Sequence, residues 1–126
     1  MKINKKKFIY LISPNKISGK FYHNLNKILN TQKINYFQMR LKNYSFAKKL
    51  IIGNKIKKIC KKNNVKLIIN DNPLLAKKLK ADGCHLGQKD TSITEAKKII
   101  PKKIIGITCH NSIKLAKIAI KHKANY

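Results

Sequence analysis

The chain has 126 residues, and its 30 basic side chains against 4 acidic ones give a formal net charge of +26. At this length we expect a single domain, and 43% hydrophobic residues make the sequence too apolar for a disordered basic tail. No apolar run approaches the roughly 18 residues of a membrane span. The apolar run Phe8–Ile12 within Met1–Ile12 is too short for a secretory signal. The chain has three cysteines, an odd number for a disulfide framework. These features exclude a membrane protein and a secreted disulfide scaffold, and they predict a cytoplasmic protein.

The charge raises the question of nucleic-acid binding, because lysine-rich surfaces bind phosphate backbones. However, 29 of the 30 basic residues are lysines, and they are spread along the whole chain. A dedicated binding surface concentrates its basic residues and adds arginine and aromatic side chains. We therefore expect no specific nucleic-acid partner and keep a basic nucleic-acid-binding protein as an alternative, which predicts DNA binding that survives physiological salt.

Short runs of β-branched residues alternate along the chain with segments of helical period. These runs predict strands at residues 8–12, 35–40, 65–69, 82–86 and 103–108, with 124–126 as the start of a sixth. The helices between them begin at residues of capping type, which are Asn72 before Pro73, Ser92 with Glu95 in the spacing of a capping box, and Asn111 or Ser112. Gly53 interrupts the longest predicted helix and is expected to weaken it.

Repeated strand–helix units predict a parallel sheet, as either an open doubly wound sheet or a (β/α)8 TIM barrel. The pattern alone leaves both architectures open. A complete barrel takes about 200 residues or more, so five units and the start of a sixth strand would form only part of one.

In both architectures the active site lies at the carboxyl ends of the strands. The polar residues predicted there are Gln38, Arg40, Lys42, Asn70, Asp71, His85, Gly87, Gln88, Asp90, Thr108 and His110. Arg40 is the only arginine of the chain, which favours a site that needs its planar fork of donors. We interpret the set as a site for a diphosphate and Mg²⁺. Arg40 and Lys42 would neutralise phosphate oxygens, Gln38 and Asn70 would donate to others, and Asp71 and Asp90 would hold the metal.

Each part of this set has a structural alternative. The run Asn70–Pro73 also has the composition of a turn and a helix cap, and Arg40 and Lys42 also suit a solvated strand end. We interpret Glu95 and Asp82 as structural, the latter because it precedes a strand at the opposite end from the site. The pairs Cys84-His85 and Cys109-His110 suggest zinc, but neighbours on a strand point to opposite faces, so we do not expect a zinc site.

The sequence resembles the N-terminal part of the thiamine-phosphate synthase family. The resemblance rests on five segments in the family's order: Tyr10–Pro14, Phe37-Gln38-Met39-Arg40-Leu41-Lys42, Ile68–Ala76 with its Asn70-Asp71 pair, Ala81–Asp90 with His-Leu-Gly-Gln-Lys-Asp, and Ile104–His110. The resemblance implies a (β/α)8 barrel, incomplete here, with residues 1–126 as one partial domain. It also implies an enzyme that joins 4-amino-2-methyl-5-(diphosphooxymethyl)pyrimidine to 4-methyl-5-(2-phosphoethyl)thiazole, giving thiamine phosphate and diphosphate.

The resemblance also assigns roles to residues. It implies that Gln38, Arg40, Lys42, Asn70 and Thr108 bind the pyrimidine diphosphate, that His85 lies by the pyrimidine, and that Asp71 and Asp90 ligate Mg²⁺. Departure of diphosphate leaves a pyrimidine-methyl cation that the thiazole nitrogen traps, so no protein nucleophile is required.

The sequence departs from the family pattern after residue 126, where the implied contacts to thiazole phosphate and a further lysine would follow. A longer protein, a decayed product and a barrel completed by a second chain all fit this departure, and we expect that the 126-residue chain alone does not turn over. Its partners are expected to be small-molecule substrates, with an oligomer or a complementing chain possible. A thiazole tautomerase-like barrel stays as a further alternative, although it would not need the diphosphate and magnesium set.

Overall fold

The structure, a computed structural model, describes residues 7–126, so the beginning of the Met1–Ile12 segment lies outside the described residues. The chain forms an α/β fold with five parallel strands, namely β1 (Tyr10–Ile12), β2 (Tyr36–Met39), β3 (Lys66–Asn70), β4 (Gly83–Leu86) and β5 (Ile104–Ile107). They lie in the order β1-β2-β3-β4-β5, so each strand pairs with its neighbours in sequence. Over the described residues this order lacks the reversal that a doubly wound sheet requires.

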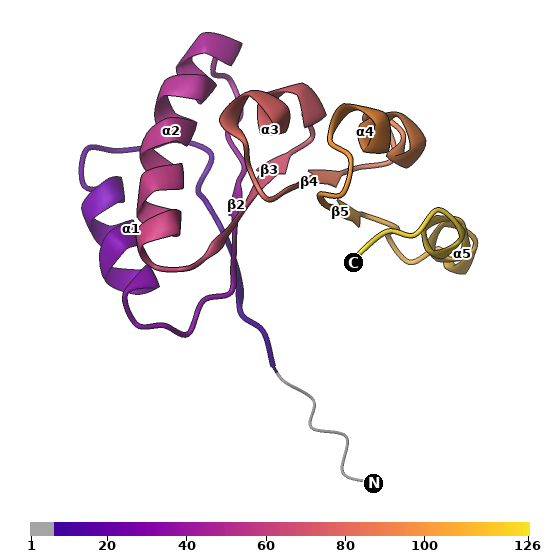
Figure 1. Ribbon diagram of the computed structural model, residues 1–126, viewed down its shortest axis with the longest axis horizontal. Helices are drawn as coiled ribbons and strands as arrows, with labels where there is room; N and C mark the ends of the chain where they lie inside the picture. The colour runs from indigo at the N-terminus through magenta and orange to yellow at the C-terminus, as the bar shows by residue number, and fades with distance from the viewer. Residues whose placement is uncertain (1–6) are drawn as a thin grey trace, which may run out of the picture.

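The five helices follow the strands one by one as α1 (Phe21–Leu29), α2 (Phe46–Lys62), α3 (Pro73–Leu79), α4 (Ile93–Ile99) and α5 (Ile113–Lys121). Figure 1 shows them arranged around the outer side of a curved sheet, with the strands on the inner side. None of the helices in residues 7–126 is both long and apolar enough to cross a membrane. The predicted strands agree with the observed bounds to within two residues at each end.

The last residues do not form the predicted sixth strand, but they lie beside β5 as a strand would. The Ile107 amide donates to the Tyr126 carbonyl at 2.9 Å, and the Asn125 amide donates to the Ile105 carbonyl at 2.8 Å. The backbone of this segment therefore continues the sheet past β5 and brings the Tyr126 side chain to the inner face.

The core fills the space between the helices and the outer face of the sheet. Along β3, Leu67 and Ile69 belong to this core with helix residues such as Leu29 and Ile56, all almost fully buried. Strand residues alternate between faces, so Ile68 and Asn70, which alternate with Leu67 and Ile69, lie on the inner face. The apolar core thus fixes the direction in which the polar residues of each strand point.

Helix α2 continues through Gly53 without a break. Gly53 is buried, and a Cβ at this position would lie 2.5 Å from the Cδ1 atom of Leu79 on α3. The missing side chain therefore allows α2 and α3 to pack closely, which gives this glycine a packing role beside its propensity cost of roughly 1 kcal/mol.

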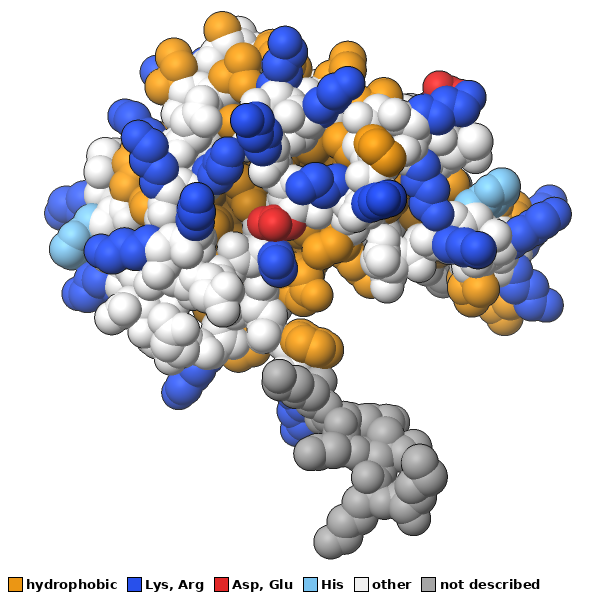
Figure 2. All heavy atoms as spheres, in the orientation of Figure 1, with side chains coloured by type: hydrophobic (Ala, Val, Ile, Leu, Met, Phe, Trp, Pro, Cys, Tyr) orange, Lys and Arg blue, Asp and Glu red, His pale blue; other side chains and the backbone are white. Residues whose placement is uncertain are grey.

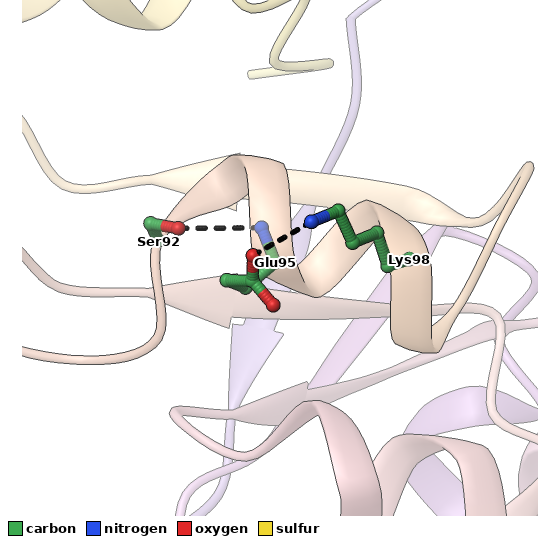
Figure 3. A network of polar contacts seen from close by, with 3 residues as sticks. All are labelled: Ser92, Glu95 and Lys98. Atoms are coloured by element: carbon green, nitrogen blue, oxygen red, sulfur yellow. Dashed lines mark hydrogen bonds and ion pairs between the residues drawn. The ribbon is translucent and has the colours of Figure 1, made fainter.

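The helix caps follow the prediction with one correction at α4. Ser92 Oγ accepts from the Glu95 amide at 3.2 Å, as a capping box requires. The Glu95 carboxylate does not complete the box, because it pairs with Lys98 at 3.0 Å on the next turn (Figure 3). On α5 the capping residue is Ser112 rather than Asn111, since its Oγ accepts from the Leu115 amide at 3.2 Å.

Candidate active site

A cavity of about 720 Å³ opens at the carboxyl ends of the strands, on the inner face of the sheet. All eight residues that the sequence assigned to substrate or metal line it, namely Gln38, Arg40, Lys42, Asn70, Asp71, His85, Asp90 and Thr108. They come from the ends of β2, β3, β4 and β5 and from the loops that follow. The prediction that these side chains gather at one place therefore agrees with the structure.

The loop after β1 holds Arg40 at the mouth of this cavity. The buried Ser13 accepts from the Arg40 amide through its Oγ at 2.8 Å, and it lies 3.3 Å from the Arg40 carbonyl oxygen. The guanidinium Nη1 donates to Asn15 Oδ1 at 3.3 Å. This contact occupies one of the five guanidinium N–H groups, so the others can meet an anion in the cavity.

The residues at and after the end of β3 have two roles: some cap helix α3 and others line the cavity. Asn72 caps α3, since its Oδ1 accepts from the Leu75 amide at 3.0 Å, and Pro73 occupies the first turn. Asn70 and Asp71 instead line the cavity. Asp71 has a positive φ of 65°, and its amide donates to the His85 carbonyl at 2.7 Å, which ties the turn to β4. The cap interpretation is therefore confirmed for Asn72 and Pro73, while Asn70 and Asp71 lie in the cavity where a ligand could reach them.

A tight loop after β4 presents Asp90. One carboxylate oxygen, Oδ2, accepts from the Gly87 amide at 2.8 Å, and the Asp90 amide donates back to the Gly87 carbonyl at 3.3 Å. A side chain at Gly87 would approach this oxygen to 2.9 Å, so glycine leaves room for the contact. The loop therefore fixes the Asp90 carboxylate where it lines the cavity.

Asp90 lies close enough to Asp71 to affect the charge of the Asp71 carboxylate. Partial burial and the neighbouring Asp90 raise the pKa of Asp71, while Arg40 and Lys49 act in the opposite direction. Two carboxylates that repel each other in a cavity with room for phosphate and water form a donor set that fits Mg²⁺. Among residues 7–126, no group of three or more His, Cys, Asp or Glu side chains is placed so that it could hold a metal ion.

His85 sits deeper in the cavity wall than the carboxylates. Burial lowers its pKa, and the charge of Asp90 opposes this effect only in part. Its Nε2 lies 2.7 Å from Thr108 Oγ1, and Gln88 Nε2 donates to the Thr108 carbonyl at 2.8 Å. These contacts fix the end of β5 against the loop after β4.

Sequence reasoning missed two tyrosines of the cavity wall. Tyr10 and Tyr126 both line the cavity, and their hydroxyl oxygens are 2.6 Å apart although 116 residues separate them. Gln38 Nε2 donates to Tyr10 Oη at 2.8 Å. The period of β1 could have placed Tyr10 on the inner face, but nothing in the sequence predicted where Tyr126 would point.

Asp82 and the surface lysines lie as the sequence analysis expected, away from the cavity or spread over the surface. Asp82 accepts from the Leu67 amide at 2.8 Å and lies 3.9 Å from Lys66 Nζ, so it joins two strands at the end opposite the cavity. Lysine and arginine side chains are scattered over the face shown in Figure 2, with few acidic groups between them. This distribution matches the spread of lysines along the sequence.

Comparisons with known proteins bear on the whole described chain. A sequence model of a family described as thiamine monophosphate synthase matches residues 9–126. A thiamine-phosphate synthase from Pelagibacter ubique is 62% identical over 129 residues, which is 100% of this chain and 62% of that protein. A thiamine-phosphate synthase from Erythrobacter litoralis is 37% identical over 121 residues, which is 94% of this chain and 57% of that protein.

A solved structure shows the same fold. The thiamine phosphate pyrophosphorylase from Pyrococcus furiosus superimposes with a TM-score of 0.84 at 27% identity, covering 94% of this chain and 57% of that one. The chain therefore spans less than two thirds of the length of these relatives. The matches support the synthase reading and lend no support to the tautomerase or nucleic-acid alternatives.

Proposed function

This chain belongs to the thiamine monophosphate synthase family, and we propose that its cavity binds the pyrimidine diphosphate substrate implied by the sequence resemblance. The observation that carries the proposal is the meeting of Arg40, Lys42, Asp71 and Asp90 around one cavity. Two cations match the charge of a diphosphate, and two carboxylates match the metal that accompanies it.

Each side chain has a part in this proposal. Arg40 and Lys42 bind diphosphate oxygens, and the amide groups of Gln38 and Asn70 and the hydroxyl of Thr108 donate further hydrogen bonds. His85 contacts the pyrimidine. Gln38, Asn70 and His85 lie on strands, so these groups are positioned before the substrate arrives, which lowers the entropy cost of binding.

Asp71 and Asp90 would hold Mg²⁺. When bound, the metal would neutralise charge that develops on the leaving diphosphate. Arg40 and Lys42 act in the same way. Their attraction to the diphosphate increases as the bond to the pyrimidine methylene breaks, because the diphosphate keeps the electron pair. The resulting pyrimidine-methyl cation is trapped by the thiazole nitrogen, so the side chains orient and stabilise rather than attack.

The architecture we propose is the first five units of a (β/α)8 TIM barrel, forming one partial domain. The sequential strand order, the helices on the outer side and the contact between Tyr10 and Tyr126 across the inner face support it. We also propose a cytoplasmic location, supported by three free cysteines.

The test is calorimetric titration of the full chain with the pyrimidine diphosphate in the presence of Mg²⁺. Arg40→Lys keeps the charge but removes the fork, and we expect it to weaken binding at least about tenfold, the value of one strong charged hydrogen bond. Lys33→Ala is the matched control, because it removes a positive charge from an exposed position before β2. We expect no change for this control, and Asp71→Asn and Asp90→Asn should remove the Mg²⁺ dependence.

Two results would contradict the proposal: no binding by the parent chain, or equal losses for Arg40→Lys and Lys33→Ala. The same preparation tests a separate expectation, that the 126-residue chain alone forms no thiamine phosphate, because the implied thiazole contacts follow residue 126. Product formation from both substrates would refute that expectation and leave the binding proposal intact.

A further inference from the structure

Five polar side chains form one continuous line of hydrogen bonds across the cavity wall: Gln38, Tyr10, Tyr126, His85 and Thr108. Gln38 Nε2 donates to Tyr10 Oη at 2.8 Å, and the two phenol oxygens are 2.6 Å apart. Tyr126 Oη lies 3.3 Å from His85 Nδ1, and His85 Nε2 lies 2.7 Å from Thr108 Oγ1. The position of the proton in one link therefore constrains the next.

The direction of the line follows from the protons that each group carries. An amide N–H can only donate, so Tyr10 accepts from Gln38 and has its own proton to give to Tyr126. Tyr126 then gives its proton to His85 Nδ1, and a neutral imidazole that accepts at one nitrogen donates at the other. Burial lowers the pKa of His85 and raises the pKa of both tyrosines, and each shift favours the neutral form that this line of hydrogen bonds uses.

We infer that Tyr126 is a positioning residue of this site: it holds His85 in the tautomer with the proton on Nε2 and leaves the Thr108 hydroxyl as a donor that faces the cavity. In the reverse direction, the Thr108 hydroxyl would donate its proton to His85 Nε2 and would not be free to donate to a ligand. This direction would also leave the Tyr10 hydroxyl with no acceptor among the hydrogen bonds of the described residues.

Gly106 gives Tyr126 its place in this line. A Cβ at position 106 would overlap the Tyr126 ring and lie 2.7 Å from its hydroxyl oxygen. The ring stacks on His85 with centroids 5.6 Å apart and an interplanar angle of 24°. The missing side chain on β5 therefore lets the phenol reach both Tyr10 and His85.

The consequence for a ligand rests on the proposed function. A diphosphate oxygen accepts hydrogen bonds, and a Thr108 hydroxyl with a free proton would add a donor to the cations of Arg40 and Lys42. The tautomer of His85 itself does not depend on the identity of the ligand, so it can be measured on the free chain.

The experiment is a long-range ¹H–¹⁵N correlation spectrum of the histidine rings in the ¹⁵N-labelled full chain at pH 7.5, without substrate, with His85→Gln to assign the signals. We expect a single Nε2–H tautomer for His85, with Nδ1 shifted as a hydrogen-bond acceptor. Tyr126→Phe should move the Nδ1 resonance toward that of an unbonded imine nitrogen. Gly106→Ala should have the same effect while keeping the hydroxyl.

Tyr36→Phe is the matched control. Tyr36 stacks on Tyr10 with centroids 5.9 Å apart, and its hydroxyl makes no hydrogen bond to the described residues, so its removal should leave the His85 signals unchanged. An Nδ1–H tautomer in the parent chain, or an unchanged Nδ1 shift in Tyr126→Phe, would overturn the inference. Since no substrate is present, either result is separate from a failure of the binding proposal.

Discussion

Replacing Gly83 by alanine should destabilise the chain where β4 passes β5. The added Cβ would lie 2.7 Å from the Cβ of Ile104 and closer still to the Ile104 carbonyl oxygen. Optimal carbon contacts are about 3.5 Å or more, so the strands would have to separate by about 1 Å. Overpacking costs about 1–3 kcal/mol, and we expect the upper part of this range because the obstacle is backbone. The smaller entropy of an unfolded alanine chain offsets about 0.5 kcal/mol, which leaves about 2 kcal/mol.

Urea unfolding of the full chain, followed by circular dichroism, measures this cost. With a slope of about 2 kcal/mol per molar urea, the midpoint should fall by about 1 M. Gly19→Ala is the control, because no atom lies within 4 Å of a Cβ built there. Its midpoint should stay the same or rise slightly. Equal midpoints for the two variants would refute the close approach of β4 and β5 that also positions His85, two residues along the same strand.

Two further predictions concern titratable groups. Asp71→Asn should raise the melting temperature in EDTA at pH 7. Burial and Asp90 raise the folded-state pKa of Asp71, so the parent chain loses stability as the pH rises through that value and the carboxylate ionises. The increase in melting temperature for Asp71→Asn should therefore be smaller at pH 4 than at pH 7. An equal increase at both pH values would contradict this prediction. Burial raises the pKa of Cys60 and Cys84 to about 12, so a thiol reagent should modify only the partly exposed Cys109 rapidly in the native chain. Rapid loss of two or more thiols without unfolding would show that this burial does not hold.

Local sequence signals predicted the strands, the capping roles of Asn72 and Ser92, and the polar strand-end residues that line the cavity. They succeeded because strand period and capping chemistry act over a few residues, as at Asn72 and Ser92. The direction of Arg40, Asn70 and His85 followed from the same period once the neighbouring residues had packed into the core. The position of the eight residues at one cavity agrees with their places at or just after strand ends, whereas the roles of His85 and Thr108 came from the family resemblance.

Features that depend on distant partners were not predictable. The buried role of Gly53 depends on Leu79, which lies on another helix. The spacing of Ser92 and Glu95 suggested a capping box, but the Glu95 carboxylate pairs with Lys98 three residues along the helix. The strand order and the meeting of Tyr10 with Tyr126 are set by the curvature of the whole sheet, which no short pattern encodes.

The pairing of each strand with its sequence neighbour has a consequence for how the chain acquires its shape during synthesis. Every ladder joins segments adjacent in sequence, so each βα unit can dock on the preceding one as it leaves the ribosome. The bond between the Tyr10 and Tyr126 hydroxyls, 116 residues apart, cannot form until translation has passed the last unit. The sheet can thus grow early while the hydroxyl network on its inner face closes late, and amides of the ladder should gain protection from hydrogen exchange before the ring of Tyr126 becomes ordered.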